Sequence, residues 1–528
     1  MGQLEKERKN WEGVWDEIVE FVIPRRTQVE RDAARGKRND QSIFDGTALD
    51  SLKLLADGLQ GYLISSSYKW FAMKMEDQRI EEVPAVRSWL QEVERLLYGI
   101  INRSNFYRQM HEMFMDAGSF GTAAIYSELD PGRGRVNFST RHPKEIYLVQ
   151  DNYGHITEVW RYYFMTIKQI VETFENVDEH YTRLLEKTPD ERYPVIHCVY
   201  PREGRDVTKK DSQNKAYASQ YIDVTHKKVF RSSGYDQLPY AVWRFYKNSD
   251  EVYGRSPAWN ALADVKSINE VAKTNVWAAQ MSVRPPLWVP EELKGRVRFV
   301  PGGMNYYSDD PKRAIAPVMT GVNYPIGVDR EDRMREAINK HFMVDFFLLI
   351  ARAEKEMTAT EIREKQEEKS VVLGPTVNGL EQECLDPVID RGFYLALEQG
   401  WLPPPPEFLA GAQMKIDYMG PLAQAQRRFF RSQPYRNTLQ EMMPVLQVRP
   451  EVADIINWDE VAKDIMEAND MPQSAFMKPE MIRAIRQQRA QQMQQQQQLE
   501  AMEKMGKALP GIADPNVIEQ IEKAAPAV

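Results

Sequence analysis

The chain has 528 residues, of which 42% are hydrophobic and 28% are charged, an ordinary balance for a globular protein of about two to four domains. Its 69 basic and 77 acidic residues give a net charge of −8, which argues against a protein that grips duplex DNA tightly through the phosphates. The two cysteines, Cys198 and Cys384, argue against a disulfide framework and fit a reducing compartment.

The first part of the chain is predicted to be helical. Apolar residues recur there with the spacing of one helix face, and Trp11 and Trp15 belong to the first such stripe. The predicted helices cover residues 3–23, 47–65, 83–103 and 106–118. Residues 25–41 are polar and of mixed charge, so we expect an exposed loop or arm after the first helix.

From residue 123 onward the period changes to the alternation that is typical of strands. The predicted strands cover residues 123–129, 136–140, 145–150, 155–164, 193–200, 217–224, 228–232 and 240–246, with a short helix at 166–175. Together with the helices, these strands predict an α+β fold that is predominantly helical. His197 and Cys198 are neighbours in one strand, so their side chains point to opposite faces and do not form a catalytic dyad.

Two long helices with a short insert follow the strands. Ser256-Pro257 begins the first helix, because Ser is a good N-cap and Pro is tolerated at the first helical position. That helix runs to about residue 283, where Arg284-Pro-Pro ends it. The second begins near Asp329, and its apolar stripe is Met334, Ile338, Phe342, Phe346 and Leu349. The insert between them is rich in Pro and Gly, so only short strands fit there, such as residues 296–300.

A polar break and further helices complete the chain. The break carries alternating charges at Arg352, Glu354, Lys355 and Glu356. The next helix is expected to kink at Gly374-Pro375. A short strand is predicted at residues 414–418, and helices at 422–446, 451–468 and 479–505. Residues 487–498 are nearly all glutamine, and we favour a helix there over a disordered tail because apolar residues keep approximate helical spacing.

Motifs for catalysis, metals and cofactors are not found. The pair Gly374 and Gly379 lacks the lysine of a phosphate-binding loop, and His111-Glu112 is not followed by the second histidine of a zinc helix. Residues 118–121, Gly-Ser-Phe-Gly, predict a turn at a helix end rather than a nucleophile elbow. No apolar run approaches the roughly 20 residues of a membrane span, and the N-terminus lacks an apolar signal core. We therefore expect no enzyme activity, no cofactor and no membrane segment.

The surface of the helix pair has two interpretations. Two helices bury only the seam between them, so Trp259, Trp277 and Phe347 need further neighbours. These are supplied either by the rest of one large fold or by other copies of the chain. The basic residues of the pair could contact DNA phosphates, or they could lie on solvated faces and pair with acids: Lys266, Lys273, Arg330, Arg333 and Lys340.

Two motifs resemble the portal (head-to-tail connector) proteins of short-tailed, T7-like bacteriophages. Glu251-Val-Tyr-Gly-Arg-Ser-Pro257 and the helix after it resemble the start of the portal stem. Met357-Thr-Ala-Thr-Glu-Ile-Arg363 resembles the segment after the tunnel loop. The order of helix, small insert, helix, polar loop and long helix is also the portal order, and the likeness extends over about residues 11–486.

The resemblance implies a portal-type fold with a wing, a helical stem, a small α/β clip and a helical crown. It implies a wing at 1–255, stem helices at 256–283 and 328–350, a clip at 284–327, a tunnel loop at 351–358, a long wing–crown helix at 359–402, a crown at 403–486 and a Gln-rich C-terminal helix with a loose tail at 487–528. The last region could form a barrel. The resemblance also implies that Arg352, Glu354, Lys355 and Glu356 lie near DNA.

In function, the resemblance implies a homo-oligomeric ring, commonly a dodecamer, at one capsid vertex of the virion, assembled in the host cytoplasm. Double-stranded DNA passes through its channel during packaging and ejection. The implied partners are the major capsid protein, scaffolding protein, the large subunit of the terminase and a tail adaptor. Trp259, Trp277, Phe342, Phe346 and Leu349 are then expected in stem packing or subunit interfaces. The alternative is a helical adaptor or scaffold protein of a virion without a channel.

Overall fold

The computed structural model of the chain describes residues 2–24, 42–81, 83–130, 132–175, 177–209, 211–283, 287–288, 316–317, 325–351, 373–406, 409, 413–423, 438, 441–444, 448–468, 477 and 479–508. The chain divides into two compact units, Met1–Phe429 and Phe430–Val528. The described residues form a mixture of helices and sheets, as predicted. Among them, no helix has both the length and the apolar character that crossing a membrane requires.

Two antiparallel sheets form the β-rich part of the first unit. The smaller sheet has the order β3-β2-β9, and the larger is a meander with the order β4-β5-β6-β7-β8. The strands of the smaller sheet are β2 (Thr122–Asp130), β3 (Arg135–Arg141) and β9 (Tyr240–Arg244). Those of the larger are β4 (Ile146–Gln150), β5 (Ile156–Thr166), β6 (Arg192–Pro201), β7 (Tyr217–Asp223) and β8 (Lys228–Tyr235). All eight strands predicted in this region are confirmed.

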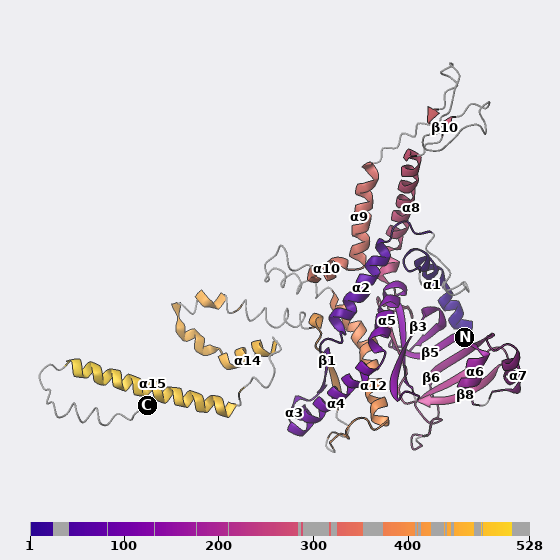
Figure 1. Cartoon of the computed structure of the whole chain (residues 1–528). Coiled ribbons are helices and arrows are strands. Elements are labelled where there is room, and N and C mark those ends of the chain that lie inside the picture. Colours follow the sequence, from indigo (N-terminus) through magenta and orange to yellow (C-terminus); the bar gives the residue numbers. More distant parts are fainter. Residues whose placement is uncertain are drawn as a thin grey trace. The chain divides into compact units, whose positions relative to one another are not determined.

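Helices enclose the core beside the smaller sheet. The predicted N-terminal helices are confirmed as α1 (Gly2–Phe21), α2 (Thr47–Leu63), α4 (Pro84–Arg103) and α5 (Phe106–Phe120). α5 is the most enclosed, because its residues from Met113 to Phe120 are all buried. It packs on α2 and on β2, and the Phe114 ring meets the buried Trp243 of β9 edge-on, 5.9 Å between centroids. Two further helices, α6 (Ile167–Thr173) and α7 (Glu179–Lys187), lie beside the larger sheet (Figure 1).

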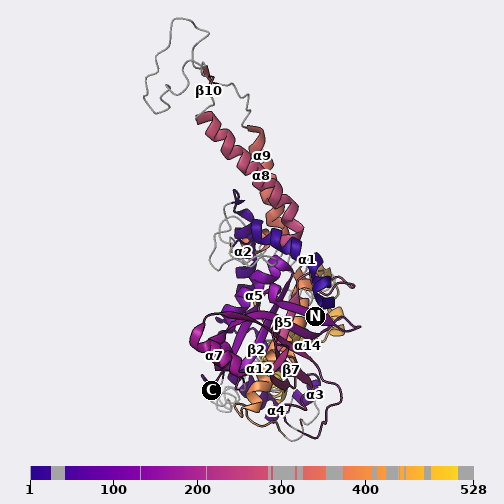
Figure 2. The same cartoon turned by 90° about the vertical axis from the view of Figure 1, so that its right-hand side faces the viewer.

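The predicted helix pair is present as α8 (Pro257–Val283) and α9 (Pro325–His341). The two helices lie side by side and lead away from the sheets in both views (Figures 1 and 2). In the insert between them, the described strands β10 (Leu287–Trp288) and β11 (Ala316–Pro317) pair antiparallel. The strand predicted at residues 296–300 lies outside the described residues.

One prediction for the second helix is wrong, because it does not continue through residue 349. The helix ends at His341, Met343 adopts a left-handed φ of 57°, and α10 (Val344–Ala351) follows in a new direction. The turn lets Phe342 and Phe346 both be buried and seats Phe347 against α2. A Cβ atom on Gly58 of α2 would lie 2.3 Å from the Phe347 ring, so the glycine makes room for it.

A helix over residues 373–398 returns to the sheets. It contains a wide turn of π-helix, Glu381–Leu385, in which the N–H of Asp386 donates to the carbonyl of Glu381. Pro387 follows at once in α12 (Asp386–Glu398), and its missing N–H explains why the regular ladder is interrupted there. The kink predicted at Gly374-Pro375 is untested, because residues 352–372 lie outside the described part.

The predicted strand at 414–418 is confirmed as β12 (Met414–Tyr418), which pairs with β1 (Phe71–Met75). In the second unit, α14 (Trp458–Ala468) follows a 3-10 turn (Pro450–Ile455), and α15 (Pro479–Ala508) includes the glutamine tract. The helix favoured for that tract is therefore confirmed. Arg486 of α15 forms a bidentate ion pair with Asp459 of α14.

Candidate assembly and channel surfaces

The base of α8 is fixed to the body by its own N-cap. The Oγ atom of Ser256 accepts a hydrogen bond from the N–H of Trp259, 2.9 Å away, as predicted for an N-cap. The same hydroxyl donates to the carbonyl of Ser119 at the end of α5, 2.6 Å away. Because Ser256 is fully buried, this hydroxyl ties the first turn of α8 to α5.

Two glycines allow the backbones to meet just before that cap. Gly121 ends α5 with a φ of +79°, and a Cβ atom on it would lie 2.2 Å from the carbonyl oxygen of Gly254. Conversely, a Cβ on Gly254 would lie 2.5 Å from the carbonyl oxygen of Gly121. Gly254 also donates its N–H to the hydroxyl of Thr122, 2.8 Å away. The predicted helix-end turn at Gly121 is confirmed, and Gly254 of the stem motif is its partner.

An ion pair joins the smaller sheet to the π-turn. The Arg244 side chain at the end of β9 is 2% exposed, and its Nη2 lies 2.5 Å from Oε1 of Glu383. Arg244 also donates to the side chain of Gln150 at 3.1 Å and to the carbonyl of Gly154 at 2.7 Å. The pair therefore connects both sheets to the helix that carries Glu383.

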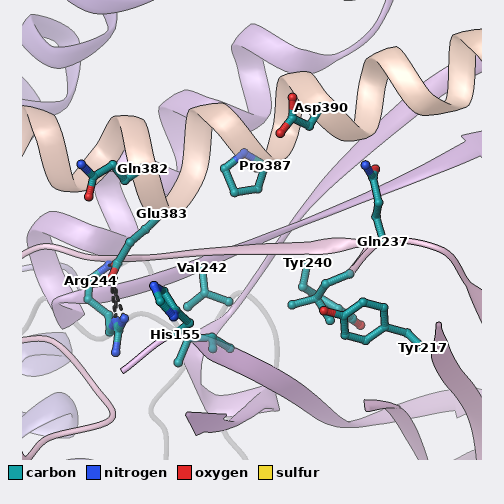
Figure 3. Close-up of a pocket in the computed structure, with 12 residues that line it drawn as sticks. His155, Tyr217, Gln237, Tyr240, Val242, Arg244, Gln382, Glu383, Pro387 and Asp390 are labelled. Atoms are coloured by element: carbon teal, nitrogen blue, oxygen red, sulfur yellow. Dashed lines mark hydrogen bonds and ion pairs between the residues drawn. The ribbon is translucent and has the colours of Figure 1, made fainter. Parts of the chain in front are cut away.

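A cavity of about 330 Å³ lies beside this ion pair, between β9 and the helix over 381–390 (Figure 3). Val242 and Pro387 contribute apolar surface, and His155, Gln237 and Asp390 contribute polar groups. Burial, followed by repulsion from Asp386, raises the pKa of the Asp390 carboxyl. Within the described part of the chain, no group of three or more His, Cys, Asp or Glu side chains is arranged to hold a metal ion.

His197 has a structural role in the larger sheet. Its Nδ1 lies 3.0 Å from the hydroxyl of Tyr240, its Nε2 lies 3.0 Å from the hydroxyl of Ser219, and its ring stacks on Tyr221 at 4.1 Å. Burial, followed by repulsion from Arg161 and other arginines, lowers the pKa of His197 to about 3. The imidazole is therefore neutral at neutral pH. Both ring nitrogens of His197 are within hydrogen-bonding distance of the hydroxyls of Tyr240 and Ser219 rather than paired with Cys198.

The five predicted packing residues of the stem separate into two groups. Trp259 packs its ring against Trp11 of α1, 5.2 Å between centroids, and Phe342 and Phe346 are buried inside the subunit. For these three the structure favours packing within the subunit. Trp277, farther along α8, is 55% exposed beside the exposed Val276. Leu349 lies in α10, and its side chain is outside the described part.

The predicted basic residues also differ from one another. Lys266 pairs with Glu17 of α1 at 2.6 Å, and Lys273 lies 3.6 Å from Glu270 and over the ring of Trp277. The remaining three are exposed on α9 and form no ion pair with any described residue: Arg330, Arg333 and Lys340. The tunnel-loop residues lie outside the described part: Arg352, Glu354, Lys355 and Glu356.

Two features of these surfaces are not predicted from the sequence. The ion pair of Arg244 and Glu383 joins residues far apart in the chain, and no local pattern signals it. The contact of Gly121 with Gly254 could have been suspected, because both glycines flank helix ends.

The exposed side chains of the helix pair include the apolar Val276 and Trp277 of α8 and the basic residues Arg330, Arg333 and Lys340 of α9. The chain belongs to the family of bacteriophage head to tail connecting proteins, whose sequence model matches residues 1–477. A probable portal protein of Bordetella phage BPP-1 is 30% identical over 500 residues, which cover 92% of this chain and 89% of that protein. The portal protein of Salmonella phage epsilon15 is 28% identical over 500 residues with the same coverage.

Proposed function

We propose that the chain is a phage portal protein. Copies of it form a ring at one vertex of the capsid, and double-stranded DNA enters and leaves through the central channel. The observation that carries the proposal is the family match over residues 1–477, together with similarity to portal proteins over nearly the full length of both relatives. The ring also serves as the docking platform for the packaging motor and the tail.

The parts of the fold are assigned within this proposal. The wing comprises residues 1–255, α8 and α9 belong to the stem, and the insert between them is the clip. The tunnel loop begins at residue 351, and the crown and C-terminal helix begin after residue 402. The antiparallel pairing of α8 with α9, rooted in the body through Ser256, supports the assignment of the stem.

Ring formation is supported by apolar surface that the subunit leaves uncovered. Trp277 and Val276 lie on α8 beyond the buried residues Val265, Ile268 and Ala272. Heterologous contacts between identical subunits close into a ring when the rotation allows it. In such a ring a neighbouring stem covers Trp277, which removes its apolar surface from water. The number of subunits, which is commonly twelve in the family, follows from that rotation.

The charges of α9 suit a channel through which DNA slides. The exposed bases Arg330, Arg333 and Lys340 are interspersed with the exposed acids Asp332 and Glu336. A mixed surface makes weak, transient contacts with phosphates, whereas a purely basic one would hold the DNA. The tunnel loop has the same mixed character, because Arg352 and Lys355 alternate there with Glu354 and Glu356. We infer that the channel wall is formed by these two segments.

The remaining partners follow from the portal role. The ring contacts the major capsid protein and scaffolding protein around its wing. The large terminase subunit hydrolyses ATP and docks on the clip, and a tail adaptor follows it after packaging. The portal itself is not an enzyme and needs no cofactor, so the purified chain is expected to show neither ATPase nor nuclease activity.

Electron microscopy of the purified protein, combined with sedimentation, tests the proposal against a virion adaptor or scaffold without a channel. Closed rings with a central hole are expected. Monomers or rods at every concentration and salt condition would favour the adaptor. ATP hydrolysis or DNA cleavage by the rings would contradict the assignment of a purely structural role.

A further inference from the structure

The cavity beside the ion pair of Arg244 and Glu383 has the size of a small-molecule site. Its volume of about 330 Å³ lies within the range of about 300–1,000 Å³ for such sites. β9 and the segment before it form one wall, and the π-turn with the start of α12 forms the other (Figure 3). Val242 and Pro387 make part of the lining apolar. The hydrogen-bonding groups of the lining then determine which kind of ligand the cavity suits.

The strongest donors in the lining are already engaged. The guanidinium of Arg244 donates to three groups of the fold itself. The hydroxyl of Tyr240 lies 3.0 Å from Nδ1 of His197, and Nδ1 of His155 lies 3.5 Å from the carboxylate of Asp151. An anionic ligand would therefore find the guanidinium of Arg244 already neutralised.

Two acceptors of the lining remain without a partner. The amide oxygen of Gln237 is buried and accepts no hydrogen bond from the described part of the chain. The carboxylate of Asp390, an exposed residue, forms no ion pair or hydrogen bond with any described residue. Figure 3 shows the side chain of Gln237 pointing toward the helix that carries Asp390. Buried polar atoms nearly always have a partner, so the amide oxygen of Gln237 requires a donor from outside the subunit.

The charge of the lining also favours a cation. The lining contains one arginine, Arg244, and two acids, Glu383 and Asp390. Since Arg244 and Glu383 neutralise each other, the charge of Asp390 is left over. Arg391 follows Asp390 in the chain, but its guanidinium lies over the ring of Tyr235, 5.3 Å from the centroid, and does not line the cavity.

The surroundings of Asp390 disfavour its charged form. Burial, followed by repulsion from Asp386, raises the pKa of this carboxyl. A cation beside the carboxylate would offset both effects, because an opposite charge favours the ionised form. A water molecule can satisfy the amide of Gln237 but supplies no charge. A cationic donor satisfies the amide and the carboxylate together.

We propose that this cavity binds a guanidinium or primary ammonium group on a short alkyl chain. The charged head donates to the carboxylate of Asp390, the amide oxygen of Gln237 is a second acceptor, and the chain lies against Val242 and Pro387. A guanidinium suits the site well, because its planar donors can reach acceptors on two walls. The group belongs either to a free small molecule or to an arginine or lysine of a second copy of this chain. The inference does not depend on the portal function.

Two ligands of nearly the same shape test the site. Butylguanidinium carries the charge, and butylurea is its neutral counterpart. Isothermal titration calorimetry on the full-length monomer is expected to show that butylguanidinium binds about fivefold or more tightly than butylurea, because only the cation forms a charged pair with the carboxylate at this partly open site. Equal affinities, or no binding of butylguanidinium to the monomer, would overturn the inference.

A matched pair of variants on α12 tests the carboxylate. Asp390→Asn is expected to weaken butylguanidinium binding about fivefold and to leave butylurea binding unchanged. Glu398→Gln makes the same chemical change on the same helix outside the lining and should alter neither affinity. The surroundings of Asp390 oppose its charge, so Asp390→Asn should keep the urea midpoint of the unaltered protein. Unchanged butylguanidinium binding in Asp390→Asn would overturn the site.

The same titration on assembled rings identifies the source of the cationic group. If an arginine or lysine of a second copy enters the cavity, the monomer binds butylguanidinium and the rings do not. If the natural ligand is a free small molecule, monomers and rings bind butylguanidinium equally well. Failure of the chain to form rings would contradict the portal function and would leave the result on the monomer standing.

Discussion

Arg244 and Glu383 are 139 residues apart in the chain, yet the guanidinium of one and the carboxylate of the other meet at 2.5 Å across the boundary between sheet and helix. The N–H of Arg244 also donates to Glu383 Oε2, 2.9 Å away, so backbone and side chain are held by one carboxylate. This contact depends on the π-turn, because Glu383 lies within it. Single turns of π-helix are rare and occur mostly as bulges inside α-helices, as this one does.

Removing the carboxylate is expected to leave a buried charge without its partner. We predict that Glu383→Ala lowers the free energy of unfolding by about 3 kcal/mol, since loss of one member of a buried pair costs more than the pair contributes. Glu398→Ala is the matched control on the same helix. Its ion pair with Lys215 is exposed, so its loss should cost below about 1 kcal/mol. Urea titrations would contradict this account if the two variants were equally stable.

Two glycine substitutions should have effects of opposite sign. Gly254→Ala forces a Cβ atom against the carbonyl oxygen of Gly121, which belongs to the backbone and cannot rotate away, so we predict a loss of at least about 2 kcal/mol. Gly392→Ala lies inside α12 with open space around it and should gain up to about 1 kcal/mol from helix propensity. Thermal unfolding measures both changes. A neutral Gly254→Ala would show that the two backbones do not meet closely.

The buried imidazole of His197 should make the free energy of unfolding depend on pH. Its pKa is lowered to about 3 in the folded state, so between that value and about pH 6.5 the unfolded chain binds a proton that the folded chain excludes. Its contribution is complete above pH 6.5 and is lost as pH falls toward 3, with a slope of about 1.4 kcal/mol per pH unit. We predict that His197→Gln removes this slope between pH 6 and about 4.5, where urea midpoints can be measured.

The control for that measurement is His155→Gln, because the His155 side chain is 79% exposed. In the His155→Gln variant, the free energy of unfolding should change with pH as steeply as in the unaltered protein. If His197→Gln also kept it, the buried imidazole would not be the source of the pH dependence.

Trp277 and Phe346 should respond differently to a charge. Trp277→Asp alters an exposed side chain, so the monomer should keep its stability within about 0.5 kcal/mol while ring formation is weakened. Phe346→Asp buries a charge inside the subunit and should cost about 3 kcal/mol or more, whether or not rings form. Circular dichroism and sedimentation separate the two effects. Normal rings from Trp277→Asp would remove that residue from the interface.

Local sequence patterns predicted the elements whose signals are local. The N-terminal helices and the sheet strands were found because apolar spacing and turn residues lie within each segment. In the same way, Ser256 predicted the start of α8, because serine is a preferred N-cap residue. α7 was missed because it is a largely exposed, charged helix with Tyr181 as its buried anchor. β1 was missed because its ladder partner is β12, far along the chain.

The turn at Phe342 and Met343 shows where local reasoning fails. The apolar spacing continues through this point, and neither glycine nor proline marks it. The chain turns because Phe346 and Phe347 gain more burial against α2 than a straight helix would allow, and Gly58 leaves the space they need. The same limit applies to the candidate site. The sequence pattern identified Trp277 and the basic residues of α9 as candidates, but tertiary packing determines which aromatic residues stay exposed.

The most direct test of the ring with a central stem is a cryo-electron microscopy reconstruction of the purified assembly that resolves helices. The proposal predicts that α8 and α9 surround a central hole, that the exposed charges of α9 face it, and that the five-stranded sheets lie at the periphery. A ring in which the helix pairs point outward and the sheets surround the hole would contradict it.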